Sequence, residues 1–363
     1  MNRQRQLYEN LMNLVQTNEA FYYVDHPMNS CIYRVFTYRL ASYTDFLEPD
    51  ALESRGHMFR LDLDGNMQEL VSWSLEKFFN YEENPMTMNL DLSDVKFIHE
   101  KRDGSLITTY DHEGKTCVKS KTALASDQAL DANRILYSDP YLLAVVSGFT
   151  LADNTVIMEY TSPENRIVLP YQTHELKILA VRDNHTGEYV DYDYLYSEYG
   201  DLMTRDHTGD FDLTDMHNVL ETIREIKGIE GFVIGLGAGQ RFKIKTAEYF
   251  ALHRAKDSIQ SDKRLFEVAL NDATDDLRTM FHDDQYTLDR IERMEALVMP
   301  LYNHLVASVE QYHSDNKHLT QKEYAVKGQR ELDRIGFHLS MQLFNGKIPD
   351  YKAMLLRNCE EYI

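Results

Sequence analysis

The pattern of apolar residues changes near residue 246, and this change constrains the fold of the chain more than any other feature. Before it, short segments such as residues 241–245 alternate apolar and polar side chains, which predicts β-strands. After it, long stretches carry apolar side chains at the spacing of helices. The sequence therefore predicts an α+β domain over residues 1–246 and an all-α domain over residues 247–363.

Local signals support the helical assignment of the C-terminal part. Thr320 and Glu323 have the spacing of a capping box, and Asn345-Gly346 is a predicted helix end. Pro300 is predicted to kink or divide the helix that contains it, because proline removes a backbone hydrogen bond. The helical spacing of apolar residues is found in three stretches: residues 265–270, 286–312 and 322–344.

Length and composition describe an ordinary globular protein with room for two cores. The chain has 363 residues, of which 43% are hydrophobic. It contains no apolar run of about 18 residues, so no membrane span is expected, and no signal-peptide core follows Met1. The three cysteines lie far apart, which predicts a reducing cytoplasm and no cysteine metal site.

The chain is strongly acidic, with a formal net charge of −21. Bulk electrostatics therefore disfavour non-specific binding of long nucleic acids. A local basic cleft is compatible with this charge, because salt screens charges that are more than about 8–10 Å apart. Any polyanionic substrate is thus expected to meet clustered lysines and arginines in a cleft.

One lysine before a tight turn carries the clearest chemical signal. An apolar strand-like run ends at Lys101, and Asp103-Gly104 predicts a turn before a second strand-like run, residues 106–110. A lysine at a strand end can be directed at a ligand with little side-chain freedom. Most Lys-X-Asp-Gly strings are ordinary surface hairpins, so the string alone does not establish a site. The same string is the signature of the covalent nucleotidyltransferases, in which the lysine attacks the α-phosphate of ATP or GTP.

Two further pairs of lysines have the spacing of neighbours on one face of a strand. Lys243 and Lys245 alternate with two apolar residues, so that one face would be cationic and the other would join a core. Lys119 and Lys121 have the same spacing. An isolated pair of this kind is more often the solvated face of an edge strand. Together with Lys101, the two pairs predict a cleft whose lysines bind phosphates.

Taken together, these motifs resemble the ATP-dependent RNA ligase 1 family of large tailed phages, over nearly the whole chain. The segments that carry the resemblance are 51–56, 76–80, 101–105, 119–121, Glu159 with 165–168, 181–182, 186–189, 230–231 and 242–245. The resemblance implies a nucleotidyltransferase (ATP-grasp-like ligase) domain, in which two mainly antiparallel sheets line an ATP cleft. It also implies that the helical domain binds tRNA, whereas DNA ligases and capping enzymes carry a β-rich OB domain instead.

The resemblance implies an enzyme that joins an RNA 5′-phosphate to a 3′-hydroxyl in three steps. Lys101 attacks the α-phosphate of ATP, which gives lysyl-AMP and releases pyrophosphate. The AMP passes to the RNA 5′-phosphate, and the 3′-hydroxyl then displaces it. The expected partners are ATP and RNA, either tRNA with a broken anticodon loop or single-stranded RNA ends. We expect a monomer that repairs tRNA in the host cytoplasm of an infected bacterium.

The family pattern also assigns roles to individual side chains, with Lys101 as the nucleophile. Glu159 and Glu230 are expected to hold Mg²⁺, or Mn²⁺ in its place, directly or through water. Asp275 and Asp276 are a second candidate cation site, although a solvated helix end is the commoner interpretation of such a pair, as it is of Asp283-Asp284. The residues assigned to ATP or AMP are Arg55, Lys77, Phe79, Gly104, Lys121, Glu159, Glu230, Lys243 and Lys245.

Two features depart from the family pattern, and other functions stay open. Arg102 stands where an acidic residue often follows the nucleophile, and strand alternation predicts that it points away from the cleft. The glycine-rich residues 235–239 are expected to alter the loop beside Lys243. They imitate a dinucleotide-binding loop, but a strand follows them where that motif needs a helix.

The alternative functions are a nick-sealing RNA or DNA ligase, and a non-catalytic RNA-binding or phage-assembly protein that retains the fold.

Overall fold

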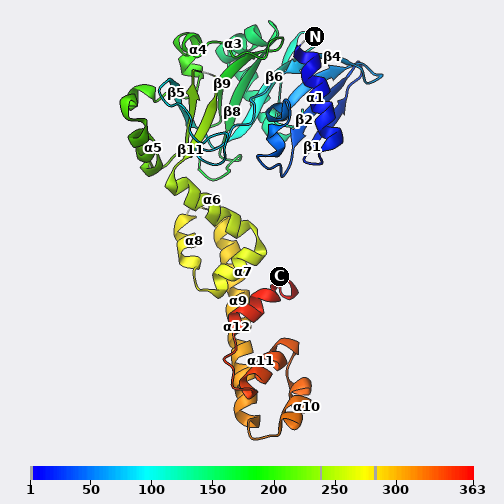
Figure 1. Ribbon diagram of the computed structural model, residues 1–363, viewed down its shortest axis with the longest axis vertical. Coiled ribbons are helices and arrows are strands. Elements are labelled where there is room, and N and C mark those ends of the chain that lie inside the picture. The colour runs from blue at the N-terminus through cyan, green and yellow to red at the C-terminus, as the bar shows by residue number, and fades with distance from the viewer. Residues whose placement is uncertain (1–2, 238, 282–283) are drawn as a thin grey trace. The chain divides into compact units, whose positions relative to one another are not determined.

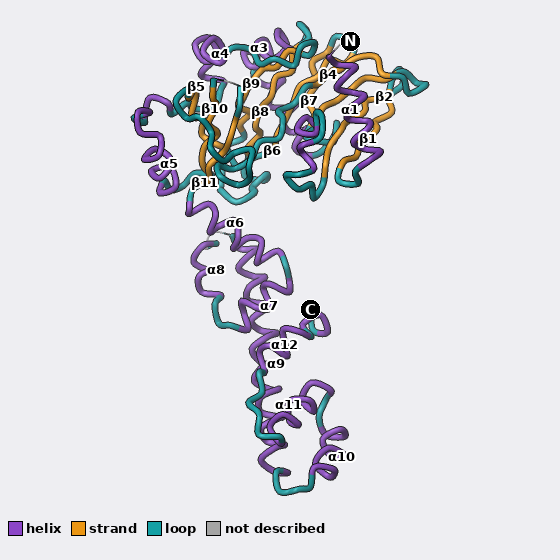
Figure 2. Tube along the Cα trace, viewed as in Figure 1, coloured by secondary structure: helices purple, strands orange, loops and turns teal. Residues whose placement is uncertain are grey.

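The computed structural model describes residues 3–237, 239–281 and 284–363. The chain divides into two compact units, Met1–Tyr249 and Phe250–Ile363. All strands of the described residues lie in the first unit, and the second unit is helical (Figure 2). The α+β class with a helical C-terminal part, predicted from the sequence, is confirmed. None of the helices in the described ranges is long and apolar enough to cross a membrane.

The first sheet is formed near the N-terminus and is antiparallel throughout. Its strands follow the order β1 (Phe21–Pro27), β2 (Ile32–Tyr38), β3 (His57–Leu61) and β4 (Met67–Ser72). Helix α1 (Arg3–Thr17) lies along this sheet (Figure 1). Its apolar stripe, which includes Leu7 and Leu11, is buried against Phe36 and Phe59.

Two further sheets follow, and every pairing of their strands is antiparallel. One has the order β11 (Arg241–Lys245), β10 (Gly231–Leu236) and β5 (Val95–Lys101). The other has the order β7 (Lys115–Lys119), β6 (Ser105–His112), β8 (Asn154–Thr161) and β9 (Glu175–Asp183). The antiparallel character was predicted, and strands of these two sheets line the cavity described below. The sheet of β1–β4 is a third one, whose strands pair only with one another.

Helices cover the outer faces of these two sheets. The helices are α2 (Asp127–Ser138), α3 (Pro140–Thr150), α4 (Tyr192–Tyr199) and α5 (Met216–Glu225). The first three pack on the four-stranded sheet of β6–β9 through residues such as Leu136, Val146 and Leu195. Helix α5 packs on the three-stranded sheet, where Leu220 and Ile223 share a core with residues of β10 and β11.

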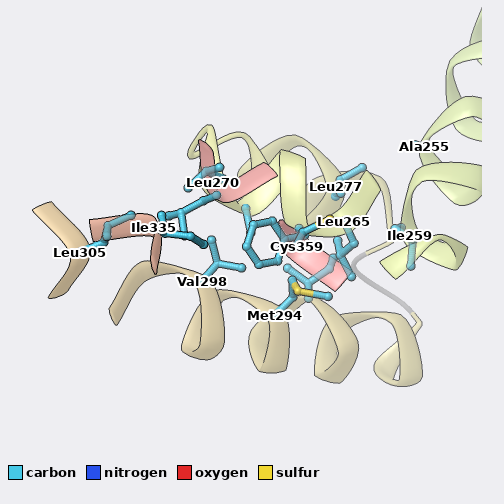
Figure 3. Packing of buried hydrophobic residues seen from close by; sticks show 14 of the residues in the cluster. Ala255, Ile259, Leu265, Leu270, Leu277, Met294, Val298, Leu305, Ile335 and Cys359 are labelled. Carbon is cyan, nitrogen blue, oxygen red and sulfur yellow. The ribbon is translucent and has the colours of Figure 1, made fainter. Parts of the chain in front are cut away.

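The second unit consists of packed helices. Helix α6 (Ala247–Gln260) leads from the first unit, and the rest are α7 (Asp262–Leu270), α8 (Thr274–Met280), α9 (Gln285–Asn316), α10 (Gln321–Glu331), α11 (Arg334–Phe344) and α12 (Tyr351–Arg357). Leu265, Met294, Val298 and Ile335 belong to one buried cluster (Figure 3).

The short 3₁₀ helices of the described residues are Asp45–Leu47, Ala51–Glu53, Gly200–Leu202, Thr208–Asp210, Leu213–Asp215 and Cys359–Glu361.

Two local predictions for this unit have opposite outcomes. The capping box of Thr320 and Glu323 is formed at the start of α10. Helix α9 continues through Pro300, so of the two effects predicted for this proline, a kink or a division, the division is wrong. Buried contacts on both sides of the proline, at Val298 and Leu305, hold the two halves on the same core and offset the lost backbone hydrogen bond.

Candidate active site

The three-stranded sheet presents one cationic face and one apolar face. Three rows of side chains cross the cationic face: Lys101–Gly231–Lys245, His99–Val233–Lys243 and Phe97–Gly235–Arg241. The intervening residues, among them Phe232 and Ile244, are buried against α5. The sequence-based prediction that Lys243 and Lys245 share one face is therefore confirmed. Because strand side chains alternate between faces, this face can hold cations without disturbing the core.

The cationic face forms one wall of a cavity of about 220 Å³. The opposite wall includes Leu106 of β6 and Leu179 of β9, and the segment after β4 contributes Leu75 and Phe78. The predicted site residues that line this cavity are Arg55, Lys77, Lys101, Glu159, Glu230, Lys243 and Lys245. Residues from distant parts of the chain thus meet in one cavity that combines a group of cations with a set of apolar side chains.

A single buried carboxylate joins two of the lysines. Glu230 is only 3% exposed, and its Oε2 lies 2.7 Å from Nζ of Lys101. Its Oε1 lies 3.1 Å from Nζ of Lys245. The carboxylate therefore fixes both amines relative to each other, since buried charged hydrogen bonds of this kind are strong and directional.

Four other cations at the site, Arg55, Lys77, Lys121 and Lys243, form no ion pair with a carboxylate among the described residues. Arg55, Lys77 and Lys121 contact aromatic rings instead, at 5.6 Å from Phe78, 5.0 Å from Phe79 and 4.4 Å from Tyr38. Burial, together with the positive charges of Lys77 and Lys101, lowers the pKa of Lys243 to about 7.

The same crowding of positive charge affects the loop after β7. Burial first, and then the nearby charges of Arg55 and Lys77, lower the pKa of Lys121. One guanidinium nitrogen of Arg55, Nη1, is buried without a hydrogen-bond partner among the described residues. Cations crowded together without anions destabilise one another, so a polyanion bound here would relieve repulsion as well as gain contacts.

Comparison with protein families matches most of the chain. A family model described as RNA ligase matches residues 53–250, and one described as T4 RNA ligase 1, C-terminal domain, matches residues 256–363. The chain belongs to the T4 RNA ligase 1 family. The family match supports an RNA ligase, and every residue that lines the cavity, apart from Tyr38, lies within the part of the chain that matches the ligase model.

Solved structures of ligases are also similar to this RNA ligase 1 family chain, at low identity. An RNA ligase of Naegleria gruberi with PPi matches at 14% identity and a TM-score of 0.35, over 45% of this chain and 52% of that one. The chain thus spans about half the length of that ligase. An archaeal ATP-dependent RNA ligase, form 1, matches at 12% identity and a TM-score of 0.47, over 90% of this chain and 93% of that one. Its form 2 matches at 10% identity and a TM-score of 0.47, over 83% and 79%.

The second carboxylate of the cavity, Glu159 of β8, is partly buried and lies close to the nucleophile candidate of this family member. Burial raises the pKa of Glu159 to about 7, and the nearby charge of Lys101 only partly opposes this effect. Glu230 also raises this pKa through charge repulsion. A carboxylate whose charge is disfavoured beside a second carboxylate suits a divalent cation, because carboxylate oxygens are the ligands that such hard cations prefer.

The other proposed metal ligands lie in the helical unit. Asp275 is exposed on α8, whereas the side chain of Asp276 and the whole of Asp283 lie outside the described residues. Asp284 caps the N-terminus of α9 by accepting a hydrogen bond from the backbone N–H of Thr287. In the described ranges, the structure contains no group of three or more His, Cys, Asp or Glu side chains arranged around a metal position.

Of two adjacent phenylalanines, the one assigned to the nucleotide from the sequence does not line the cavity. Phe79, expected beside the adenosine, is buried in the core of the first sheet, with its ring 5.7 Å from that of Phe46. Phe78 lines the cavity instead. We predict that Phe79→Ala lowers the free energy of unfolding by about 3–5 kcal/mol. Phe78→Ala should cost less than half as much but weaken nucleotide binding; thermal unfolding and nucleotide titration of the two variants distinguish these effects.

The turn after Lys101 is held in place by the side chain of Asp103, which is part of the turn. Asp103 is 2% exposed, and its Oδ2 accepts hydrogen bonds from the backbone N–H groups of Val168 and Leu169 at 2.7 and 2.8 Å. A Cβ atom on Gly104 would lie 2.3 Å from the carbonyl oxygen of Tyr160. The close approach that Gly104 permits is therefore to strand β8. Neither contact was visible in the sequence, because both partners lie far along the chain.

The paired lysines of the predicted strand 116–121 do not share a face. Strand β7 ends at Lys119, so Lys121 lies in the following loop. Lys119 is fully buried, its Nζ donates a hydrogen bond of 2.6 Å to the carbonyl of Gly56, and burial lowers its pKa to about 7. Gly56 has φ +91°, and a Cβ atom there would lie 2.6 Å from the carbonyl oxygen of Lys121. Lys119 thus supports the backbone on which Arg55 and Lys121 are placed.

Arg102 also differs from the sequence-based expectation. It was expected to point away from the cleft with a surface effect only, but it lines the cavity and is 15% exposed. Its guanidinium donates hydrogen bonds to Glu175 at 2.5 Å and to Thr161 at 3.0 Å. The ion pair with β9 holds the residue after Lys101 beside the cavity entrance.

A buried network of charges supports the cavity from one side. Arg182 pairs with Glu53 at 2.7 Å, and Glu53 pairs with His57 at 2.7 Å. Arg182 also lies 3.5 Å from Glu76, which pairs with the cavity residue Arg241 at 3.1 Å. Burial alone would raise the pKa of Glu53, but its partners His57 and Arg182 hold it well below its usual range. The network connects the segments that carry Arg55, Lys77 and Lys243.

Proposed function

We propose that this chain joins RNA 5′-phosphate and 3′-hydroxyl ends with ATP, through a covalent bond between Lys101 and AMP. The observation that supports this most is the convergence of Lys101 with cations that have no carboxylate partner. A nucleotide triphosphate supplies the missing negative charge, and the apolar wall of Leu106, Leu179 and Phe78 suits a purine.

In the first step, the neutral amine of Lys101 attacks the α-phosphorus of ATP. The new N–P bond replaces the bond to the bridging oxygen, and pyrophosphate leaves. Arg55, Lys77 and Lys243 would bind the phosphates and neutralise the charge that develops on them. Glu230 would hold the amine in line for attack, since it already bonds both Lys101 and Lys245.

The second and third steps use the same cavity. The oxygen of an RNA 5′-phosphate attacks the phosphorus of lysyl-AMP, which returns the amine to Lys101 and forms a diphosphate-linked RNA end. A 3′-hydroxyl then attacks the RNA 5′-phosphorus and AMP leaves. We propose Mg²⁺, with Mn²⁺ as a substitute, and Glu159 and Glu230 as its protein ligands. When bound, such an ion supplies charge neutralisation at the phosphates.

For the acceptor we propose RNA ends, either single-stranded or in a tRNA with a broken anticodon loop, bound with help from the helical unit. We also propose that the enzyme is a monomer of the cytoplasm of an infected bacterium, where tRNA repair would use it. Three free cysteines, Cys31, Cys117 and Cys359, agree with a reducing compartment. Parallel assays with single-stranded RNA, cleaved tRNA, nicked duplex and DNA would separate this proposal from a nick-sealing ligase.

The proposed function is tested by incubating the purified chain with ATP and Mg²⁺ and measuring its intact mass. A gain of one AMP that maps to Lys101 is the expected result. If the folded chain carries no AMP beforehand and gains none, the ligase proposal fails and a non-catalytic RNA-binding role becomes the better account. Prior treatment with pyrophosphate, which reverses the first step, removes any AMP already bound.

The lowered pKa of Lys243 gives a prediction for the pH dependence of nucleotide binding. The pKa of Lys243 is about 7 in the free protein, and bound phosphates should raise it by favouring the ammonium form. Binding should therefore take up a proton above pH 7. The affinity should be highest below about pH 7 and fall by up to about tenfold per pH unit above it.

Calorimetry with α,β-methylene ATP, in buffers of different ionisation enthalpy, measures this proton uptake without lysyl-AMP formation. The matched control is Lys243→Arg, whose side chain stays charged and should bind without proton uptake at pH 8. Equal proton uptake by both proteins would contradict the assignment to Lys243.

A further inference from the structure

One polar ring in the cavity is not used by the proposed chemistry. His99 precedes Lys101 by two residues on β5 and therefore lies on the same face of the strand, one row further along the sheet. Two residues of a strand span about 7 Å. Its row partners are Val233 and Lys243. With the α-phosphate at Lys101, the His99 ring lies one row away from the phosphate, at the opposite end of its row from Lys243.

The His99 ring is fixed by its neighbours. It is 4% exposed and stacks on Phe97 with ring centroids 4.3 Å apart and an interplanar angle of 29°. The ring of Tyr192 lies 4.9 Å away on another side. The hydroxyl of Tyr192 donates a hydrogen bond of 2.8 Å to Asp206, and this bond holds the Tyr192 ring beside His99. A ring whose orientation is fixed in this way can bind a ligand selectively at little cost in conformational entropy.

The His99 ring has unused hydrogen-bonding capacity. Its Nε2 has no hydrogen-bond partner among the described residues, although buried polar atoms nearly always have one. Burial lowers the pKa of His99 to about 4, so the ring is neutral near pH 7 and offers one donor and one acceptor nitrogen. The other polar side chains that line the cavity are acidic or basic groups, apart from the Tyr38 hydroxyl.

A neutral ring of this kind matches the edge of a purine better than it matches a phosphate. The adenine edge carries an amino-group donor next to a ring-nitrogen acceptor. Leu75, Leu106 and Leu179 line the same cavity and would cover the apolar faces of the base. A charged group facing the base edge would instead lose hydration without gaining a counter-charge.

We propose that His99 is a nucleobase-reading residue, which forms a hydrogen bond with the 6-amino edge of adenine and favours ATP over nucleotides that lack this group. The proposal rests on the proposed function, because it places a nucleotide in this cavity. The proposal assigns selectivity for the base to His99, in addition to the residues proposed to bind the phosphates.

The test is a competition between ATP and purine riboside triphosphate, which lacks only the 6-amino group. Both nucleotides are offered at equal concentration, and the two covalent adducts are separated by intact mass. For the wild-type chain, the ratio of adducts should favour AMP. In His99→Leu this preference should fall about 3- to 10-fold, the value of one neutral hydrogen bond.

Two further variants keep the result interpretable. His99→Gln retains an amide donor and acceptor and should keep part of the preference, even if His99→Leu proves unstable. His112→Leu removes a histidine that bonds Tyr33 away from the cavity and should leave the preference unchanged. An adduct ratio that is the same in wild-type, His99→Leu and His99→Gln would overturn the proposal for His99. No adduct with either nucleotide in the wild-type chain would instead overturn the proposed ligase function.

Discussion

Replacing Lys101 by alanine is expected to abolish adenylylation and ATP-driven joining, with a loss of order 10⁴-fold or more. The amine is the nucleophile of the proposed first step, and no other lysine can replace it. Lys245 shares the carboxylate of Glu230 but projects from a different strand, so its amine is not placed for the same attack. Transfer of labelled AMP to the protein and joining of 5′-phosphorylated RNA measure the two losses.

The same variant should retain part of its activity on pre-adenylylated RNA. The third step joins a 3′-hydroxyl to an end that is already activated, and it needs the phosphate-binding cations but not the nucleophile. Lys96→Ala is the matched control, because Lys96 lies on the same strand and is exposed beside Asp94. Full adenylylation of Lys101→Ala would show that another residue is the nucleophile. Loss of the fold, measured by circular dichroism, would show that Lys101 is structural.

Replacing Arg182 by methionine is expected to lower the free energy of unfolding by about 3–5 kcal/mol. The guanidinium donates two hydrogen bonds to Glu53, at 2.7 and 2.9 Å, and one to the carbonyl of Ser74 at 2.8 Å. Methionine would fill most of the volume but leave Glu53 buried with only His57 and a long hydrogen bond of 3.4 Å from Trp73 Nε1 as partners. An unpaired buried carboxylate must either lose its charge or draw in water, and both cost stability.

Denaturant unfolding of Arg182→Met, with Arg60→Met as the control, compares the loss of a buried ion pair with the loss of an exposed one. Arg60 pairs with Glu69 on the surface, with side chains 38% and 45% exposed, so its loss should cost less than about 1 kcal/mol. A similar, small effect in both variants would mean that the buried network contributes little net stability. Adenylylation should also slow in Arg182→Met, because the network supports the segments that carry Arg55 and Lys77.

Much of the fold follows from local patterns, and these patterns were sufficient where a strand has one buried face. The alternation over residues 241–245 is enough to place Lys243 and Lys245 on one face and the apolar residues on the other. Helices α3 and α4 were not predicted. Helix α3 is apolar over most of its length and α4 is rich in tyrosine, so neither shows the one-sided pattern that identifies a surface helix.

The site was less accessible to sequence reasoning, because its geometry depends on contacts between distant segments. Nothing near Arg102 indicates that Glu175 will pair with it, and nothing near Lys119 indicates that the strand ends there. The choice between Phe78 and Phe79 depends on the direction of an irregular segment after β4. His99 is different, since its spacing of two residues from Lys101 on a strand was a signal that sequence analysis did not use.

The register of the three-stranded sheet limits how this chain can change in evolution. Cavity residues and core residues alternate along the same strands, so a one-residue insertion inside β11 would move Phe242 and Ile244 into the cavity and two lysines into the core. Insertions in the hairpin between Leu236 and Arg241 would not change this alternation. Relatives are therefore expected to vary in the length of this hairpin while the spacing from Glu230 to Leu236, and from Arg241 to Lys245, stays constant.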